Sequence, residues 1–292
     1  MRNQNLRFNY LTIMRNNLFF RLLRFFNTLK NDGLSWTIAR IFLRILKQPN
    51  EMQRAKNKVL DKIIREHGYK VAYGNFKGMK LNKDIYWAKN DLITHILGVY
   101  EKHVLEKLTE FSKRGNFPFI DIGAADGYFA VGMAFSKIFK KVYAFEINES
   151  GRVSLDKNAE NNQCKDKIVI NDEANFNSIK KIVDENNGAV ILFDIEGSEF
   201  DLLDQKLLES LTNCYIVCEL HPLLVNSGYD KQQALINNSK AFFNVSIIQR
   251  DSYCPNKFSE LNEFTDDERL LAFGEGRENN MNWLILEPKL KN

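Results

Sequence analysis

The stretch FPFIDIGAADGYFAVGMAFSKIFKKVYAFE, residues 117–146, decides the fold. It begins with an apolar run, Phe117 to Ile122, whose length and composition predict a β-strand. A glycine-bearing turn follows, and an apolar-periodic segment from Tyr128 to Phe139 predicts a helix. The next apolar run, Val142 to Ile147, predicts a second strand, which carries Glu146. The order predicts a βαβ unit with an acid near the end of its second strand.

The turn inside this unit reads Gly123-Ala124-Ala125-Asp126-Gly127. Glycines let a backbone approach a ligand closely, and the N–H groups at the start of the next helix face that ligand. An acid at the end of the second strand can accept both hydroxyls of a ribose. The pattern therefore predicts a nucleotide-type site, and a purely structural glycine turn is the alternative.

The charges around the turn discriminate between nucleotide cofactors. A dinucleotide fingerprint needs a glycine two residues after Gly123, where Ala125 stands. Asp121, at the end of the strand, and Asp126, in the turn, would repel a pyrophosphate but suit a cationic ligand. S-adenosylmethionine carries a sulfonium and an ammonium group, so the sequence favours it as the cofactor.

The α/β alternation continues along the chain after Glu146. Further strands are expected at residues 167–171, 189–193, 214–220, 244–249 and 282–287, most of them separated by helical segments. This order implies a mostly parallel sheet with helices on both faces. No helix-length periodic segment separates the last two strands, so the last strand is expected to insert antiparallel. Such a closing hairpin is typical of the class I methyltransferase sheet, an α/β Rossmann-like fold.

Charge divides the chain into parts of different kinds. Residues 1–50 hold nine Lys and Arg against one acid, which gives 9 − 1 = +8, and the rest of the chain sums to 4 − 8 = −4. Residues 1–50 predict a basic amphipathic helical hairpin, residues 51–99 a connecting helix and a β lead-in, and residues 100–292 the Rossmann-like domain. The hairpin could lie on an anionic membrane surface, on its own domain or on a second copy in a homodimer.

The same N-terminal part bears on the compartment. Arg7, Arg15, Arg21 and Arg24 interrupt each apolar run short of a signal peptide or a membrane span. The four cysteines include no CxxC pair, which disfavours a zinc site and fits a reducing compartment. We expect a cytoplasmic protein, with peripheral contact at the inner face of the membrane left open.

Several segments together resemble one known family. DIGAADGYFAVG, AFEIN, FDIEGSEFDLL and ELHP, in this order and spacing, resemble the FkbM-type branch of S-adenosylmethionine-dependent methyltransferases, and the resemblance runs from about Tyr69 to Lys289. It implies an O-methyltransferase acting on a hydroxyl of a sugar or glycan precursor, as in surface polysaccharide modification. The alternatives are another small-molecule or nucleic-acid acceptor, and a non-catalytic scaffold that recruits partners through the N-terminal helices. A net acidic catalytic part without an Asn-Pro-Pro-Tyr element disfavours nucleic acid.

The resemblance and the turn together assign the cofactor residues. The backbone of the turn would close around the methionine part, the two acids would face its ammonium group, Glu146 would hold the ribose, and the acids after the third strand would approach the adenine amino group. The residues are Asp121, Gly123, Ala124, Asp126, Gly127, Glu146, Asp172 or Glu173, and Asp194 at the methyl end.

The catalytic candidates follow the fourth and fifth strands, on the rim where open α/β sheets bind ligands. Asp194 is expected to line the methyl end of the cofactor, and Glu196 to accept a hydrogen bond from a substrate hydroxyl. His221 is the first choice of base, because its pKa lies near neutrality. A histidine that merely caps the strand end is the alternative.

Three further expectations concern the same rim. Asp194, Glu219 and His221 could instead hold a divalent metal, although we prefer a site without a metal. Glu199 begins a helix, where the helix dipole favours an acid, so a structural role is expected. Arg277 is a candidate for gripping an anionic substrate group, and an internal salt bridge is its alternative.

Overall fold

The computed structural model describes residues 51–83, 91–250, 253–274 and 281–289. The chain divides into two compact units, residues 1–58 and 59–292. The predicted N-terminal hairpin and Arg277 lie outside the described residues. The predicted connecting helix is present as α3 (Glu51–His67). Among the described helices none is long and apolar enough to cross a membrane.

A seven-stranded sheet organises residues 59–292, with the strand order β3-β2-β1-β4-β5-β7-β6. The strands are β1 (Phe119–Ile122), β2 (Val142–Phe145), β3 (Ile168–Asn171), β4 (Val190–Phe193), β5 (Tyr215–Leu220), β6 (Phe243–Gln249) and β7 (Asn282–Pro288). Strands β1 to β5 pair in parallel, whereas β7 pairs antiparallel with both β5 and β6. The predicted fold class, with the last strand inserted antiparallel, is therefore confirmed.

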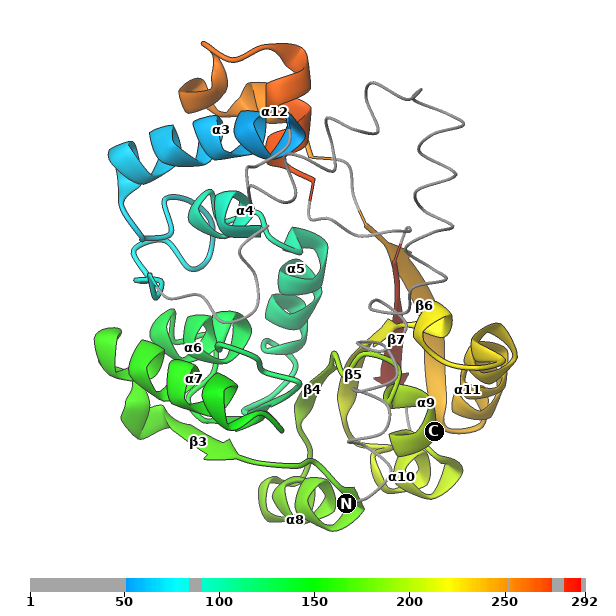
Figure 1. Cartoon of the computed structure of the whole chain (residues 1–292). Helices are drawn as coiled ribbons and strands as arrows, with labels where there is room; N and C mark the ends of the chain where they lie inside the picture. The colour runs from blue at the N-terminus through cyan, green and yellow to red at the C-terminus, as the bar shows by residue number, and fades with distance from the viewer. Residues whose placement is uncertain (1–50, 84–90, 251–252, 275–280, 290–292) are drawn as a thin grey trace. The chain divides into compact units, whose positions relative to one another are not determined.

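Helices cover both faces of this sheet (Figure 1). The described α-helices after α3 are α4 (Leu92–Ile96), α5 (Lys102–Phe111), α6 (Tyr128–Phe135), α7 (Glu149–Asn161), α8 (Phe176–Asn186), α9 (Glu199–Leu202), α10 (Gln205–Ser210), α11 (Gly228–Phe242) and α12 (Asp266–Ala272). Apolar side chains of α5, α6 and α7 form one core on one face, and those of α8, α10 and α11 form a second core on the other. The sheet is thus buried on both sides, as its continuous apolar strands predict.

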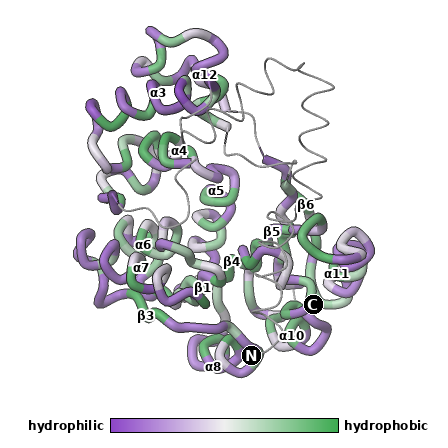
Figure 2. The backbone as a smooth tube through the Cα atoms, in the orientation of Figure 1, coloured by the Kyte–Doolittle hydropathy of each residue, from purple (hydrophilic) through white to green (hydrophobic). Residues whose placement is uncertain are grey.

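Helix α6 follows the glycine turn and is the most deeply buried helix on its face. All of its residues from Tyr128 to Ala134 are buried, because it lies between the sheet and the segment that carries Phe76. Figure 2 shows hydrophobic residues gathered along α6 and hydrophilic ones along the neighbouring α7. The βαβ unit predicted from residues 117–146 is therefore the centre of one core.

Two expectations about the connections need correction. The β lead-in expected over Gly68–Leu81 contains a single antiparallel bridge, Lys70 to Lys80, and turns otherwise. The chain between β6 and β7 contains the short helix α12, whereas no helix-length periodic segment is evident from the sequence. Thr265 begins α12 through a capping box with Glu268, so this helix depends on capping as well as on periodicity. Its Ala272 belongs to a third apolar cluster, together with Ile63 of α3.

Candidate functional site

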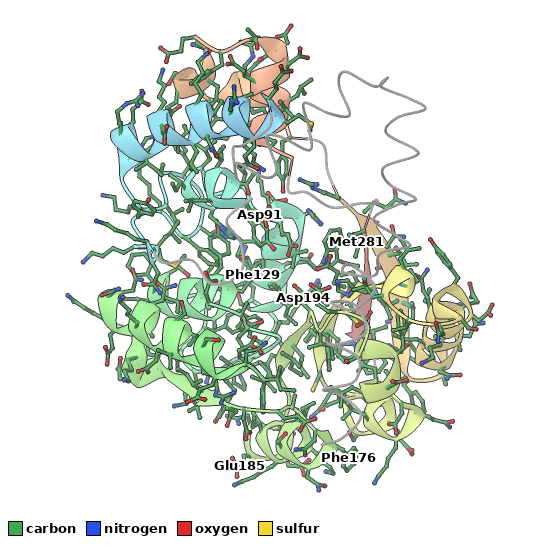
Figure 3. All side chains as sticks on the ribbon, viewed as in Figure 1. Asp91, Phe129, Phe176, Glu185, Asp194 and Met281 are labelled. Carbon is green, nitrogen blue, oxygen red and sulfur yellow. The ribbon has the colours of Figure 1, made fainter. Side chains whose placement is uncertain are left out.

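The turn after β1 requires glycine at its first position. Gly123 has φ +95°, and a Cβ atom there would lie 1.8 Å from the backbone oxygen of Asp194. The turn after β1 therefore packs directly on the segment that follows β4. Figure 3 labels Asp194 in this central region. The structure thus brings the predicted cofactor turn and the predicted methyl-end carboxylate together.

Glu146 faces this turn from the end of β2 and is 7% exposed. Its Oε2 accepts a hydrogen bond from the N–H of Ala125 at 2.8 Å, and its Oε1 accepts one from the N–H of Asn148 at 2.7 Å. A carboxylate has about four lone-pair positions, so acceptor capacity remains for a ligand. The side chain is held against the turn, as the ribose-binding prediction requires.

Gly151 of α7 makes this position of Glu146 possible, and sequence reasoning missed it. A Cβ at Gly151 would lie 2.8 Å from Cγ of Glu146. Gly151 lies inside a predicted helix, so the sequence alone identifies it only as a residue with low helix propensity. Only the tertiary contact shows that the helix must leave space for the carboxylate.

Two acids lie around the turn, which itself carries no basic side chain: Asp121 is buried and Asp126 is partly buried. Asp121 is 2% exposed, and burial together with the charge of Asp194 raises its pKa to about 8. Burial also raises the pKa of Asp126 to about 6. Burying acids without full compensation is costly, and a cationic ligand beside them would favour their ionised forms. The donor set therefore fits a sulfonium and an ammonium better than it fits a diphosphate.

Asp172 and Glu173 follow β3, the strand that neighbours β2. Asn171 pairs in register with Phe145, so both acids lie at the same edge of the sheet as Glu146. Both side chains are exposed. Their contact with an adenine stays a prediction.

The segment after β4 carries Asp194 and Glu196. Glu196 has φ +52° and Gly197 has φ +98°, so the chain turns sharply here. The Asp194 side chain is 30% exposed and that of Glu196 is 53% exposed, so solvent reaches both carboxylates. The tight turn directs the segment toward the end of β5, where His221 follows Leu220.

His221 lies at the centre of a group of carboxylates and is 5% exposed. Its Nε2 lies 3.6 Å from an oxygen of Asp194, 3.8 Å from one of Glu219 and 3.9 Å from one of Glu196. Burial lowers the pKa of His221, but the hydrogen bond that its ring donates to Glu199 and the charges of the surrounding carboxylates together outweigh burial and raise the pKa above its usual value. The predicted convergence of Asp194, Glu196 and His221 is present.

Glu199 does more than interact with the dipole of the helix that it begins, because it also forms hydrogen bonds within the site. It is fully buried, and its Oε1 accepts the backbone N–H of His221 at 2.7 Å and lies 3.3 Å from Nδ1 of the same residue. Its Oε2 accepts the N–H of Gly197 at 2.8 Å. The expected structural role holds, because Glu199 joins the segment after β4 to the segment after β5.

A groove beside this rim was not predicted. It has a volume of about 930 Å³ and lies between α5 and the strands β6 and β7, with His103, Lys107, Glu110, Ile248, Arg250 and Asn282 among its lining residues. One lining residue, Asn282, pairs with Leu220, the residue before His221. The sequence pattern offers no sign of the groove, because its walls are far apart in the chain.

Neither a protein-family model nor a curated protein sequence matches this chain. Among solved structures, the chain is similar to the precorrin-6y C5,15-methyltransferase of Geobacter metallireducens, with 11% identity, a TM-score of 0.44, and coverage of 72% of this chain and 94% of that one. It is also similar to the tRNA methyltransferase TrmK of B. subtilis, with 12% identity, a TM-score of 0.42, and coverage of 70% and 68%. A third is the precorrin 8W decarboxylase of Methanobacterium thermoautotrophicum, with 15% identity, a TM-score of 0.41, and coverage of 64% and 89%. Likenesses of this strength carry no conclusion about activity.

Proposed function

We propose that this protein is an S-adenosylmethionine-dependent O-methyltransferase of the FkbM type, acting on a hydroxyl of a sugar or glycan precursor. The observation that carries the proposal is the position of Glu146. Its buried carboxylate accepts one N–H from the glycine turn, that of Ala125, and a second from Asn148, at the place where a ribose-binding acid belongs in this fold.

The charge around the glycine turn supports a cationic donor. Asp121, Asp126 and Asp194 surround the turn, and two of them have pKa values raised by burial. A diphosphate would add negative charge to this group, whereas S-adenosylmethionine, when bound, supplies an activated methyl group on a cationic sulfur. The lack of a glycine at position 125 also argues against a dinucleotide.

The acceptor side of the proposal depends on the groove and on the group around His221. Methyl transfer is an in-line displacement that depends mainly on the alignment of the acceptor with the donor. The groove between α5 and β6–β7 offers mixed charge, with Lys107 and Arg250 near Glu106 and Glu110. A polar acceptor with several hydroxyls matches such a lining better than an apolar one does. The hydroxyl proton would leave toward the carboxylates around His221.

Calorimetry with purified full-length protein tests the donor. We expect S-adenosylmethionine and S-adenosylhomocysteine to bind, and NAD⁺ to show no heat of binding. Absence of binding by both sulfur compounds would overturn the proposal. Mass spectrometry of surface glycans from cells with and without the gene tests the acceptor, since the proposal requires loss of one O-methyl group.

A further inference from the structure

We infer that Asp194, Glu196 and His221 bind a divalent transition-metal cation, for which Mn²⁺ is the probe. One ligand atom from each residue lies within 4.8 Å of the other two. An octahedral ion with bonds of about 2.1 Å holds neighbouring ligand atoms about 3.0 Å apart and opposite ones about 4.2 Å apart. Nε2 of His221 lies 3.6 Å from Asp194 and 3.9 Å from Glu196, so small side-chain shifts complete the site.

The hydrogen bonding of His221 prepares Nε2 as a ligand. Nδ1 lies 3.3 Å from Oε1 of Glu199, and a proton on Nδ1 donated to that oxygen leaves the lone pair on Nε2. Nε2 lies beyond hydrogen-bonding distance of the three carboxylates that face it, although the side chain is only 5% exposed. A histidine oriented by a carboxylate behind it is the usual arrangement of a metal ligand and its supporting residue.

The surrounding charge also favours a dication. Glu219 is 1% exposed and Glu199 is fully buried, and both lie against His221. The donor proposed above carries a single net positive charge, whereas a divalent cation would bring two positive charges to this group of acids. The ligand atoms of Asp194 and Glu196 group with those of His221, so Glu196, in place of the expected Glu219, is the third ligand.

A second group of one histidine and carboxylates in the described residues differs from the first, because its histidine is hydrogen-bonded directly to a carboxylate. His67 Nε2 lies 2.7 Å from Oε1 of Glu260, and the hydroxyl of Tyr73 donates to the same oxygen at 2.5 Å. Burial raises the pKa of Glu260, but the hydrogen bonds from Tyr73, a backbone N–H and His67 together outweigh burial and lower the pKa. His67, Tyr73 and Glu260 thus form a structural network, and Glu66, which lies near His67 and Glu260, pairs with Lys62. This group supplies a comparison for the first one.

The ion would act on the acceptor hydroxyl, and this role alone rests on the proposed function. A cation that coordinates the hydroxyl oxygen lowers its pKa. The oxygen lone pair then forms the new O–C bond, the C–S bond breaks with its electron pair on sulfur, and the proton goes to a nearby carboxylate or to water. Nε2 of His221 would serve as a ligand instead of as the base.

Titration of chelator-treated, full-length protein with Mn²⁺ tests the site, with electron paramagnetic resonance counting the free ion. We expect one strongly bound ion per chain, and Glu196→Gln to weaken binding roughly 10- to 100-fold. Glu196 is suitable because its side chain is half exposed, so the substitution disturbs no packing. Glu66→Gln, in the comparison group, should bind Mn²⁺ like the wild type.

The outcomes separate this inference from the proposed function. No stoichiometric Mn²⁺ binding, or equal binding by wild type and Glu196→Gln, overturns the metal site even if S-adenosylmethionine binds. Mn²⁺ binding without S-adenosylmethionine binding keeps the site and defeats the methyltransferase. Ca²⁺ that binds as tightly as Mn²⁺ would contradict an imidazole ligand, because calcium prefers oxygen ligands.

Discussion

The carboxylate of Glu199 receives the backbone N–H of His221 at 2.7 Å and thereby ties the end of β5 to the segment after β4. The other oxygen of Glu199 receives the N–H of Gly197, at 2.8 Å. Both oxygens are fully buried, so each N–H depends on this one side chain. The relative position of Glu196 and His221 therefore depends on a residue that contacts neither a donor nor an acceptor in the proposed reaction.

Replacing Glu199 by Gln should destabilise the fold. The amide offers a single acceptor oxygen, so one buried N–H loses its partner and faces an NH₂ group. We expect a loss of about 2 kcal/mol in the free energy of unfolding, measured by urea denaturation. Glu196→Gln, at the exposed position two residues after Asp194, should stay within about 0.5 kcal/mol of wild type in metal-free buffer. Equal stability of the Glu199 variant and wild type would contradict the joining role.

Glu146→Gln tests the ribose acid. The variant keeps the shape of the side chain but loses the charge and half of the acceptor capacity, which Ala125 and Asn148 already use. We expect S-adenosylmethionine to bind roughly 10- to 100-fold more weakly by calorimetry. The exposed Glu149, three residues away, gives the control: Glu149→Gln should bind like wild type. An unchanged affinity of the Glu146 variant for S-adenosylmethionine would show that the donor binds elsewhere.

Much of the fold could be predicted from the sequence because its strands are short apolar runs with clear turns between them. The run Phe117–Ile122 contains β1, and the missing helix-length pattern before residue 282 led to the antiparallel β7. The error at α12 has a local cause. That helix has seven residues and an acidic first turn, and so lacks a readable apolar period.

Only those parts of the site that lie within one sequence motif could be predicted. Gly123 lies in the turn after β1 and Glu146 directly follows β2, so both belong to one continuous βαβ segment that the sequence pattern shows. Gly151 is important only because α7 passes Glu146, and the groove exists only because α5 lies opposite β6. Such contacts join distant segments, and one sequence without its fold does not show them.

Gly123→Ala tests the contact between the cofactor turn and the segment after β4. The new Cβ would lie 1.8 Å from the backbone oxygen of Asp194, and alanine would also have to adopt φ +95°. A backbone atom cannot move out of the way as a flexible side chain can. We therefore expect the free energy of unfolding to fall by more than about 3 kcal/mol, measured as a large decrease in the urea midpoint. Gly274→Ala is the control, because its nearest contact is an ordinary 3.4 Å. A stable, S-adenosylmethionine-binding Gly123 variant would contradict this packing.

His95 should make the stability of the protein depend on pH. It is 4% exposed, its ring centroid lies 4.2 Å from those of both Tyr100 and Tyr128, and its Nε2 has no hydrogen-bond partner. Burial lowers its pKa from 6.5 to about 3. Below pH 6.5 the His95 side chain takes up a proton in the unfolded chain but stays neutral in the folded one. The free energy of unfolding therefore has its full value above pH 6.5 and falls as the pH drops toward 3.

The variant His95→Phe keeps a ring between the two tyrosines and removes the titration. Between pH 6.5 and 5 we expect wild type to lose about 1.5–2 kcal/mol more unfolding free energy than the variant, measured by urea denaturation at each pH. At pH 7.5 the two proteins should differ only by a constant packing term, which serves as the reference. Parallel pH profiles for the two proteins would mean that the pKa of His95 is the same in the folded and the unfolded state, in conflict with its burial beside Tyr128.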